Sequence, residues 1–230
     1  MRIVAHRGCS AVAPENTLAA IRRAVEAGAD GIEVDVRLTR DGAVVLLHDP
    51  DLLRTAGDPR PVARCTLLDL AALDVGRWFG PDFAGEPIPT LDAAIAAANG
   101  VPMDIELKAE VAGIRLADRV LEVLRTAGAL DRCWITSSDL GVLTHVAVSD
   151  PSVRTGWVVD GPLPVELPTR LRCVCVAEWL VDADLPGRAA AAGLEVWAWT
   201  VNDAARAREL REMGVAAVIT DDPERLRHGL

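Results

Sequence analysis

The stretch Gly31 Ile32 Glu33 Val34 Asp35 Val36 Arg37 decides how the fold of this chain is interpreted. Apolar and charged residues alternate along it, which is typical of a β-strand with one apolar and one polar face. The polar face carries Glu33 and Asp35 side by side. Two carboxylates on one strand face repel each other and are costly to bury without a cation. A divalent metal ion is therefore expected in front of this strand.

A second strand shows the same alternation over residues 103–108, Met103 Asp104 Ile105 Glu106 Leu107 Lys108. Strands of a parallel sheet that are buried on both faces are normally almost continuous apolar runs. We therefore expect Asp104, Glu106 and Lys108 to point into a polar barrel lumen or its mouth, although an edge strand with one wet face would give the same pattern. Glu33, Asp35 and Glu106 together would offer three oxygen ligands of the kind that Mg²⁺ and Ca²⁺ prefer.

Strand-like apolar runs alternate with helical segments along the whole chain, and this rhythm predicts a parallel sheet with helices outside. At 230 residues the chain fits one α/β barrel, so residues 1–230 are predicted to form a single domain. The runs lie at 3–6, 31–36, 43–48, 102–107, 133–137, 153–158, 172–177, 195–200 and 216–220. That is one run too many for a TIM (β/α)8 barrel, so we expect an irregular barrel with one run outside it.

The predicted barrel departs from the regular strand–helix order in the interval between Asp35 and Val44. It is too short for a crossover helix, and Asp41 Gly42 is a hairpin turn signal. We therefore interpret residues 37–39 as a descending arm, after which the chain climbs again through 43–48 as the third strand.

Helices are expected from Pro14 to Gly28, with Asn16 or Thr17 as the cap, and from Thr90 onward. Further helices are expected at 112–126, 139–148, 186–192 and 203–213. Residues 50–89 are rich in Pro and Gly, with a helix only at 66–73. This segment is predicted to be a small insertion over the barrel mouth, because irregular segments of this length are usually functional or lids.

Composition narrows the possible partners and location. A net charge of -10 argues against nucleic acid and anionic membranes, which reward clustered Lys and Arg. Neither a signal peptide nor an apolar run long enough to span a bilayer is present, so a cytoplasmic location is expected. The five cysteines show no CxxC pair and are interpreted as reduced, packed thiols.

Two of the four histidines, His6 and His48, end predicted strands, where parallel α/β folds carry their active sites. His145 and His228 are interpreted as structural or solvated. Arg7 and Lys108 lie near the same mouth and would bind an anion such as phosphate. A hard metal, fixed cations and two imidazoles suit phosphoryl chemistry, with one histidine as acid and the other as base.

The chain closely resembles the glycerophosphodiester phosphodiesterases in a series of short motifs that run in order from its first strand to its last. These motifs are His6 Arg7 Gly8, Pro14 Glu15 Asn16 Thr17 Leu18, Gly28 Ala29 Asp30 Gly31 Ile32 Glu33 Val34 Asp35 Val36, Thr39 Arg40 Asp41 Gly42 through His48 Asp49, Leu53 Arg54 Thr55, Ile88 Pro89 Thr90 Leu91, Ile105 Glu106 Leu107 Lys108, Trp199 Thr200 Val201 Asn202, and Ile219 Thr220 Asp221 Asp222 Pro223. Each motif alone is weak, but their ordered sum covers essentially the whole chain.

The resemblance implies a phospholipase-C-like TIM barrel that hydrolyses glycerophosphodiesters, such as glycerophosphocholine, to glycerol 3-phosphate and an alcohol. It also implies a role for each candidate site residue. The metal, Ca²⁺ or Mg²⁺, would be held by Glu33, Asp35 and Glu106, the acid and base would be His6 and His48, phosphate would be bound by Arg7 and Lys108, and the glycerol side would be walled by Trp199.

Two alternatives stay open. One is a lysophospholipase D or sphingomyelinase-D-like activity, which an apolar groove on the insertion would favour, although its residues could equally form the insertion's own core: Leu52, Leu53, Trp78, Phe79 and Phe83. The other is a catalytically silent barrel that binds a phosphorylated metabolite, against which the second strand-end histidine argues. The preferred head group, the native metal, the individual roles of the two histidines and the oligomeric state are left undecided by the sequence.

Overall fold

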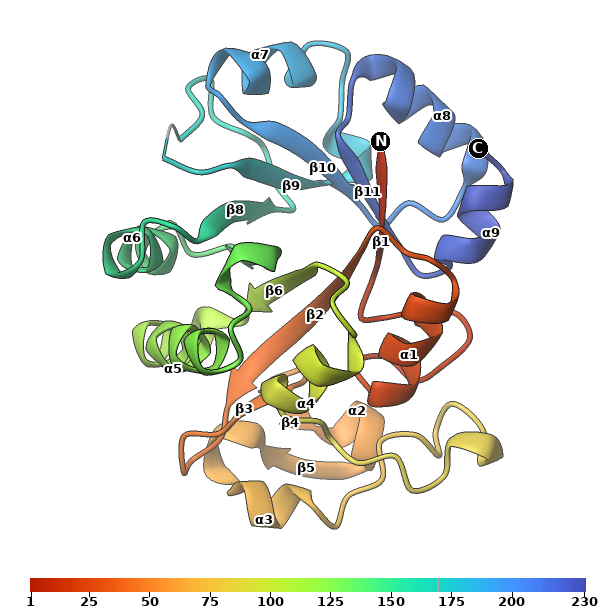
Figure 1. The fold of residues 1–230 in the computed structure, drawn as a ribbon, viewed down its shortest axis with the longest axis vertical. Helices are drawn as coiled ribbons and strands as arrows, with labels where there is room; N and C mark the ends of the chain where they lie inside the picture. Colours follow the sequence, from red (N-terminus) through yellow and green to blue (C-terminus); the bar gives the residue numbers. More distant parts are fainter. Residues whose placement is uncertain (169) are drawn as a thin grey trace.

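Eight parallel strands close into a barrel, because β1 pairs with β11 on one side and with β2 on the other. The structure is a computed structural model, and it describes residues 1–168 and 170–230. Figure 1 shows the strands fanning out around the lumen. The barrel strands are β1 (Arg2–Ala5), β2 (Gly31–Leu38), β6 (Met103–Leu107), β7 (Cys133–Ser137), β8 (Arg154–Val159), β9 (Cys173–Ala177), β10 (Glu195–Trp199) and β11 (Ala217–Thr220). The predicted irregular TIM barrel is confirmed.

The surplus run is β3 (Val44–Leu46), which pairs antiparallel with the end of β2 and takes no place in the barrel. The interpretation of residues 37–39 as a descending arm is wrong. Strand β2 continues straight to Leu38, and β3 is the arm that returns after the turn at Gly42, whose φ of 86° suits glycine. Apolar alternation reveals a strand but not its direction, so the hairpin signal alone could not tell which arm stays in the barrel.

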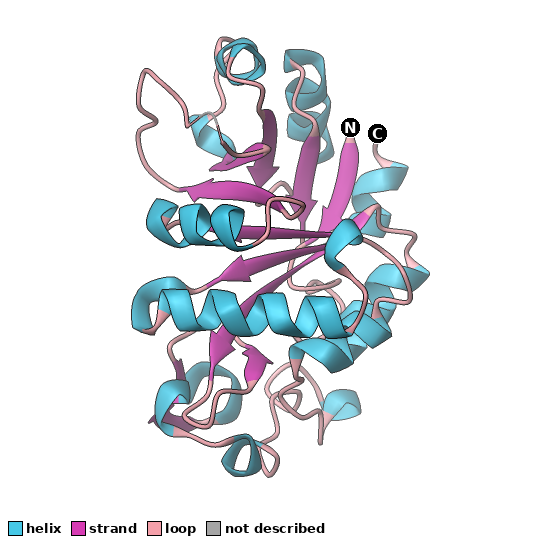
Figure 2. Ribbon diagram, turned by 60° about the vertical axis from the view of Figure 1, so that its left-hand side comes forward, coloured by secondary structure: helices cyan, strands magenta, loops and turns pink. Residues whose placement is uncertain are grey.

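Seven helices follow barrel strands and wrap the outside of the barrel (Figure 2). They are α1 (Leu18–Glu26), α4 (Leu91–Ala97), α5 (Gly113–Thr126), α6 (Leu140–Ser149), α7 (Leu185–Ala191), α8 (Ala204–Met213) and α9 (Pro223–His228). Between β8 and β9 the described residues, 160–168 and 170–172, contain no helix, which makes the barrel irregular at a second point. None of the described helices is both long enough and apolar enough to cross a membrane.

The insertion, residues 50–89, forms a small body beside β3 at the bottom of Figure 1. It contains β4 (Asp51–Leu52) paired with β5 (Asp58–Pro61). The short helix α2 (Leu53–Ala56) connects these two strands, and the short helix α3 (Leu67–Leu70) follows them. Its own apolar core packs under β3 and comprises Val45, Leu47, Leu52, Val62, Cys65, Leu70, Val75 and Ile88. Single-turn 3-10 helices lie at Val62–Arg64, Pro81–Phe83, Ala109–Val111, Leu130–Arg132 and Glu178–Leu180. The assignment of the whole chain to one domain stays a prediction.

The lumen is filled unevenly, and this leaves room for a site at one end. Inward-facing apolar residues pack in its lower part, where the rings of Trp134 and Trp197 lie 4.7 Å apart between centroids. The inward-facing residues farther along β2 and β6 include four acids, Glu33, Asp35, Asp104 and Glu106. The outward-facing residues of the same strands, such as Val34 and Ile105, pack beneath helices in the main core.

Candidate active site

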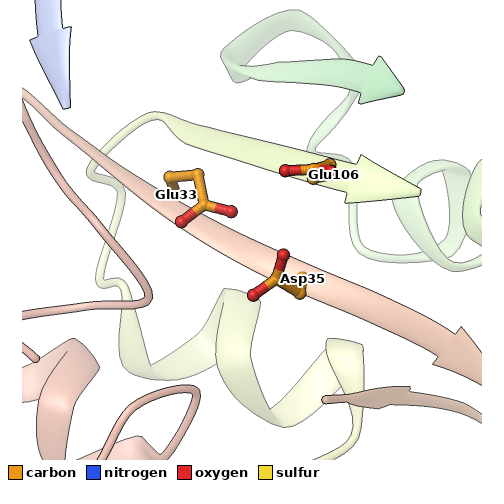
Figure 3. Close-up of side chains that lie close together, drawn as sticks. All are labelled: Glu33, Asp35 and Glu106. Carbon is orange, nitrogen blue, oxygen red and sulfur yellow. The ribbon is translucent and has the colours of Figure 1, made fainter. Parts of the chain in front are cut away.

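Three carboxylates meet at the mouth of the barrel. Glu33 and Asp35 project from β2 and Glu106 from β6, and Asp35 is the register partner of Glu106. One oxygen from each lies within 4.8 Å of the others. Figure 3 shows the three carboxylate groups turned toward a common space from two adjacent strands. The structure therefore brings together the acids that the two alternating strands predicted.

The two cations of the site neutralise only part of this charge. Lys108 Nζ lies 2.9 Å from Asp35 Oδ1 and 2.5 Å from Glu106 Oε1, and Arg7 Nε lies 3.2 Å from Asp35 Oδ2. Burial acts to raise the pKa of Asp35, but Lys108 and Arg7 outweigh it, so this pKa falls below its usual value. Asp35 therefore stays ionised.

Glu33 is the carboxylate left without compensation. Its Oε2 accepts a hydrogen bond of 2.8 Å from the backbone N–H of Arg7, but its buried Oε1 has no partner among the described residues. Burial, and then the charges of Asp35 and Glu106, raise the pKa of Glu33 well above its usual value. A buried acceptor without a partner costs free energy, and three oxygen donors suit a hard divalent cation. The residues present therefore fit such an ion.

Asn16 fixes the orientation of Asp35, a role that the sequence analysis missed. Its Nδ2 donates to Asp35 Oδ2 at 2.9 Å, and its Oδ1 accepts from the backbone N–H of Asp35 at 3.1 Å. The cap of α1 is Thr17, whose hydroxyl accepts from the N–H of Ala20. Asn16, with a φ of 56°, is thereby free to turn its amide inward. The pairing joins positions far apart in the chain, so only the folded structure reveals it.

His6 is oriented by Asp221, which follows β11. Nδ1 of His6 lies 2.7 Å from Asp221 Oδ1, and the same carboxylate accepts hydrogen bonds from Ser10 at 3.0 Å and from Asn202 at 2.6 Å. Burial acts to raise the pKa of Asp221, but the hydrogen bonds from His6 and Asn202 hold it at about 2. An ionised Asp221 accepts the proton on Nδ1 and leaves Nε2 of His6 available to the cavity.

His48 is oriented in the same way by its neighbour Asp49. Nδ1 of His48 lies 2.7 Å from Asp49 Oδ1, and Asp49 Oδ2 accepts from Arg54 at 2.7 Å. Burial acts to raise the pKa of Asp49, but the hydrogen bonds from Arg54 and His48 hold it at about 2. His48 lies at the mouth of the barrel and lines the cavity, but the route expected for the chain to reach it is wrong. His48 follows the antiparallel β3, whose return lets the N–H of Leu47 bond to the carbonyl of Asp35.

A cavity of about 240 Å³ lies between these groups. Seven of the eight predicted site residues line it, namely His6, Arg7, Glu33, His48, Glu106, Lys108 and Trp199. The eighth, Asp35, is 1% exposed and lies just beneath the surface of the cavity. The wall opposite the acids is largely apolar and contains Val158, Cys175, Trp199 and Ile219. Phosphate and an apolar substituent would thus meet different walls.

Asp104 lies at the floor of this cavity, as its predicted inward orientation requires. Its Oδ1 accepts a hydrogen bond of 2.8 Å from the hydroxyl of Thr136. Burial raises the pKa of Asp104 to about 7. The remaining histidines lie elsewhere, with His145 paired to Asp118 at 2.7 Å on the outer helices and His228 at the end of α9.

The insertion residues considered for an apolar groove have separate places, and none of them lines the cavity. Leu52 belongs to the insertion core, whereas Leu53 is exposed. Phe79 contacts Trp78 and Phe83 edge to face, with ring centroids 5.7 and 5.4 Å away. These residues thus form no wall of the candidate site.

Comparisons with known proteins agree with this geometry. The model of the glycerophosphoryl diester phosphodiesterase family matches residues 6–225. A glycerophosphodiester phosphodiesterase of Caldanaerobacter subterraneus subsp. tengcongensis is 33% identical over 233 residues, which is 97% of this chain and 95% of that protein.

Solved structures agree as well. A phosphodiesterase from Oleispira antarctica, in complex with the product sn-glycerol-3-phosphate, superimposes with a TM-score of 0.94 at 30% identity, over 100% of this chain and 96% of that one. A glycerophosphodiester phosphodiesterase from Agrobacterium tumefaciens gives a TM-score of 0.86 at 27% identity over 99% of both chains. With the family model spanning nearly its whole length, this chain belongs to the glycerophosphoryl diester phosphodiesterase family.

Proposed function

We propose that this protein hydrolyses glycerophosphodiesters to sn-glycerol 3-phosphate and an alcohol with the help of a divalent cation, Mg²⁺ or Ca²⁺. The observation that carries the proposal is the convergence of three carboxylates, one with an unpartnered buried oxygen, between two imidazoles that carboxylates orient. The Oleispira antarctica relative, which was solved with sn-glycerol-3-phosphate, supports the choice of product.

Glu33, Asp35 and Glu106 would hold the cation. When bound, it would neutralise charge on the phosphate oxygens. Arg7 and Lys108 line the same cavity and would bind the phosphate from the protein side, Arg7 through donors that Glu15 and Asp35 do not occupy. Both cations already contact Asp35, so the phosphate and the metal ligands would share one charge network.

His6 and His48 would move the protons. One imidazole accepts a proton from the attacking hydroxyl or water through Nε2, and the other donates a proton to the departing alcohol oxygen as its bond to phosphorus breaks. Asp221 and Asp49 hold the rings with Nδ1 away from the cavity, so that each ring presents a single nitrogen to the substrate. Trp199, whose Nε1 donates to the carbonyl of Cys175 at 3.1 Å, would form the glycerol side of the cavity.

An assay of product release tests this proposal. The purified protein is supplied with Mg²⁺, Ca²⁺ or Mn²⁺ and with glycerophosphocholine, glycerophosphoethanolamine or lysophosphatidylcholine. The proposal expects metal-dependent release of glycerol 3-phosphate from the deacylated diesters, abolished by a chelator. Release of phosphocholine would contradict it, and preference for lysophosphatidylcholine would favour the lysophospholipase D alternative. Tight binding of glycerol 3-phosphate without turnover under any metal would favour the non-catalytic barrel.

A further inference from the structure

Arg54 connects the insertion to the candidate site through a forked set of hydrogen bonds. It belongs to the short helix α2, and its Nε donates to Asp49 Oδ2 at 2.7 Å. Its two terminal nitrogens donate to the two oxygens of Glu15 at 2.7 and 2.8 Å. One planar guanidinium thus bridges two carboxylates from different segments of the chain.

Both carboxylates contact a cavity residue on their other side. Asp49 accepts from Nδ1 of His48, and Glu15 Oε1 accepts from Arg7 at 2.8 Å. The result is a continuous chain of contacts from His48 through Asp49, Arg54 and Glu15 to Arg7. Of these five residues, Arg54 alone belongs to the insertion, and it joins the imidazole of His48 to the guanidinium of Arg7.

Charge and its connection to two cavity residues separate this network from an isolated ion pair. Arg54 keeps its charge, because hydrogen bonds from its side chain to Glu15 and Asp49 raise its pKa. The side chain of Glu15 is only 14% exposed, so its two arginine partners have little competition from water. By contrast, Arg60 pairs with Asp58 within β5, and this pair does not line the cavity. Exposed pairs of that kind contribute little.

We propose that Arg54 is a positioning residue, through which the insertion holds His48 and Arg7 in fixed relation across the cavity. The inference rests on the proposed hydrolysis and names a residue of the insertion that this reaction requires. Arg54 neither lines the cavity nor contacts Glu33, Asp35 or Glu106, so its effect passes through Asp49 and Glu15. Lysine has a single ammonium and could not hold both carboxylates in one plane.

Steady-state kinetics of Arg54→Met, Arg54→Lys and Arg60→Met provide the first test. Misplacement of a catalytic group by about 1 Å can cost on the order of a hundredfold in rate. We therefore expect Arg54→Met to lower kcat by about ten- to a hundredfold and to raise KM, since His48 and Arg7 both lose their support. Arg54→Lys should recover only part of kcat, and Arg60→Met should match the wild type. A cooperative thermal unfolding transition in each of the three variants would establish that they are folded.

Combining Arg54→Met with His48→Ala separates positioning from a structural role. If Arg54 acts partly through His48, its replacement should lower kcat by a smaller factor in the His48→Ala background than in the wild type, with only the support of Arg7 left to lose. A wild-type kcat for Arg54→Met, or kcat losses that simply multiply in the double variant, would overturn the inference.

A spectroscopic readout keeps the inference testable without turnover. Nitrogen NMR of the imidazole rings, with His48 assigned from His48→Ala, should show a single His48 signal with Nδ1 hydrogen-bonded to Asp49 in the wild type and in Arg60→Met. Arg54→Met should show a mixture of tautomers or an exchange-broadened His48 signal. An unchanged His48 signal would overturn the inference even if no substrate were hydrolysed, whereas absent hydrolysis by the wild type would count against the proposed function alone.

Discussion

The two histidine–aspartate pairs have the same local geometry but are built by different parts of the molecule. In each, Nδ1 lies 2.7 Å from a carboxylate oxygen. The pair formed by His6 and Asp221 is supported by barrel loops, through Ser10 and Asn202. The pair formed by His48 and Asp49 lies at the edge of the insertion and is supported by Arg54. The aspartate is therefore held by barrel loops in the first pair and by the insertion in the second, where β2 holds only the backbone of His48, through Arg37.

This difference indicates which half can be perturbed without unfolding the protein. The loops around Asp221 are tied to the end of β11, since Asn202 also accepts from the backbone N–H of Asp221 and the hydroxyl of Thr220 at 2.9 Å each. The side chain of Arg54 is 41% exposed, and its partners are other side chains. We therefore expect substitutions on the barrel side to affect stability and activity together, and substitutions on the insertion side to affect activity more than stability.

Removing either imidazole should produce the largest loss of activity, and the loss should be similar for His6 and for His48. General acid–base catalysis typically contributes about 10² to 10⁴ in rate, so His6→Ala and His48→Ala should each lower kcat by that order. Both variants should still bind a divalent cation, measured by titration calorimetry, because the three carboxylates are untouched. A near-normal rate for His48→Ala would show that the acid–base assignment is wrong.

Replacing Asp221 and Asp49 should distinguish the pair that barrel loops support from the pair that the insertion supports. In Asp221→Asn, the new amide group would either face the amide N–H of Asn202 with its own N–H or turn that N–H toward Nδ1 of His6. In each orientation one hydrogen bond of a partly buried cluster is lost, which destabilises the protein by about 1 kcal/mol. For a protein of this size we expect Tm to fall by roughly 2–4 °C. Asp49→Asn should lower Tm by less, because Asp49 is held by side chains alone, and both variants should lose about tenfold or more in kcat. Equal Tm losses for the two variants would show that the two pairs contribute equally to the stability of the protein.

The sequence predicted the barrel and the acidic cluster because both depend on strand periodicity. The alternation in β2 and β6 identified Glu33, Asp35 and Glu106, and strand pairing then had to bring them together. The direction of β3 was misjudged, since the turn at Gly42 is compatible with either arm leaving the barrel. His48 lies at the mouth of the barrel, but the chain reaches it by a different route from the one predicted.

The supporting residues could not be predicted in the same way. Asn16, Glu15 and Arg54 lie in segments without periodicity, and each acts on a residue distant in the chain or on another loop. Their motifs matched the family, but a motif does not say which atom contacts which. Such side-chain pairings depend on how loops lie in three dimensions, so they emerge only with the fold.

The smallest effect is expected on the far side of the insertion. Trp78 is exposed and its indole donates to the carbonyl of Val75, away from the cavity. Trp78→Ala should therefore leave kcat and KM for glycerophosphocholine unchanged, in contrast to substitutions at Arg54. Assays with lysophosphatidylcholine give the complementary control. A selective loss of activity toward that lipid in Trp78→Ala would show that the aromatic side of the insertion binds acyl chains.

The central claim is that one cation joins the acids of β2 and β6 beneath the two imidazoles. Anomalous X-ray diffraction from crystals soaked in Mn²⁺ tests it most directly, with Glu33→Gln as the matched variant. We expect one strong peak within bonding distance of Glu33, Asp35 and Glu106 in the wild type, and a weak or absent peak in Glu33→Gln. Crystals without a peak there, in which Lys108 still bridges Asp35 and Glu106, would contradict it.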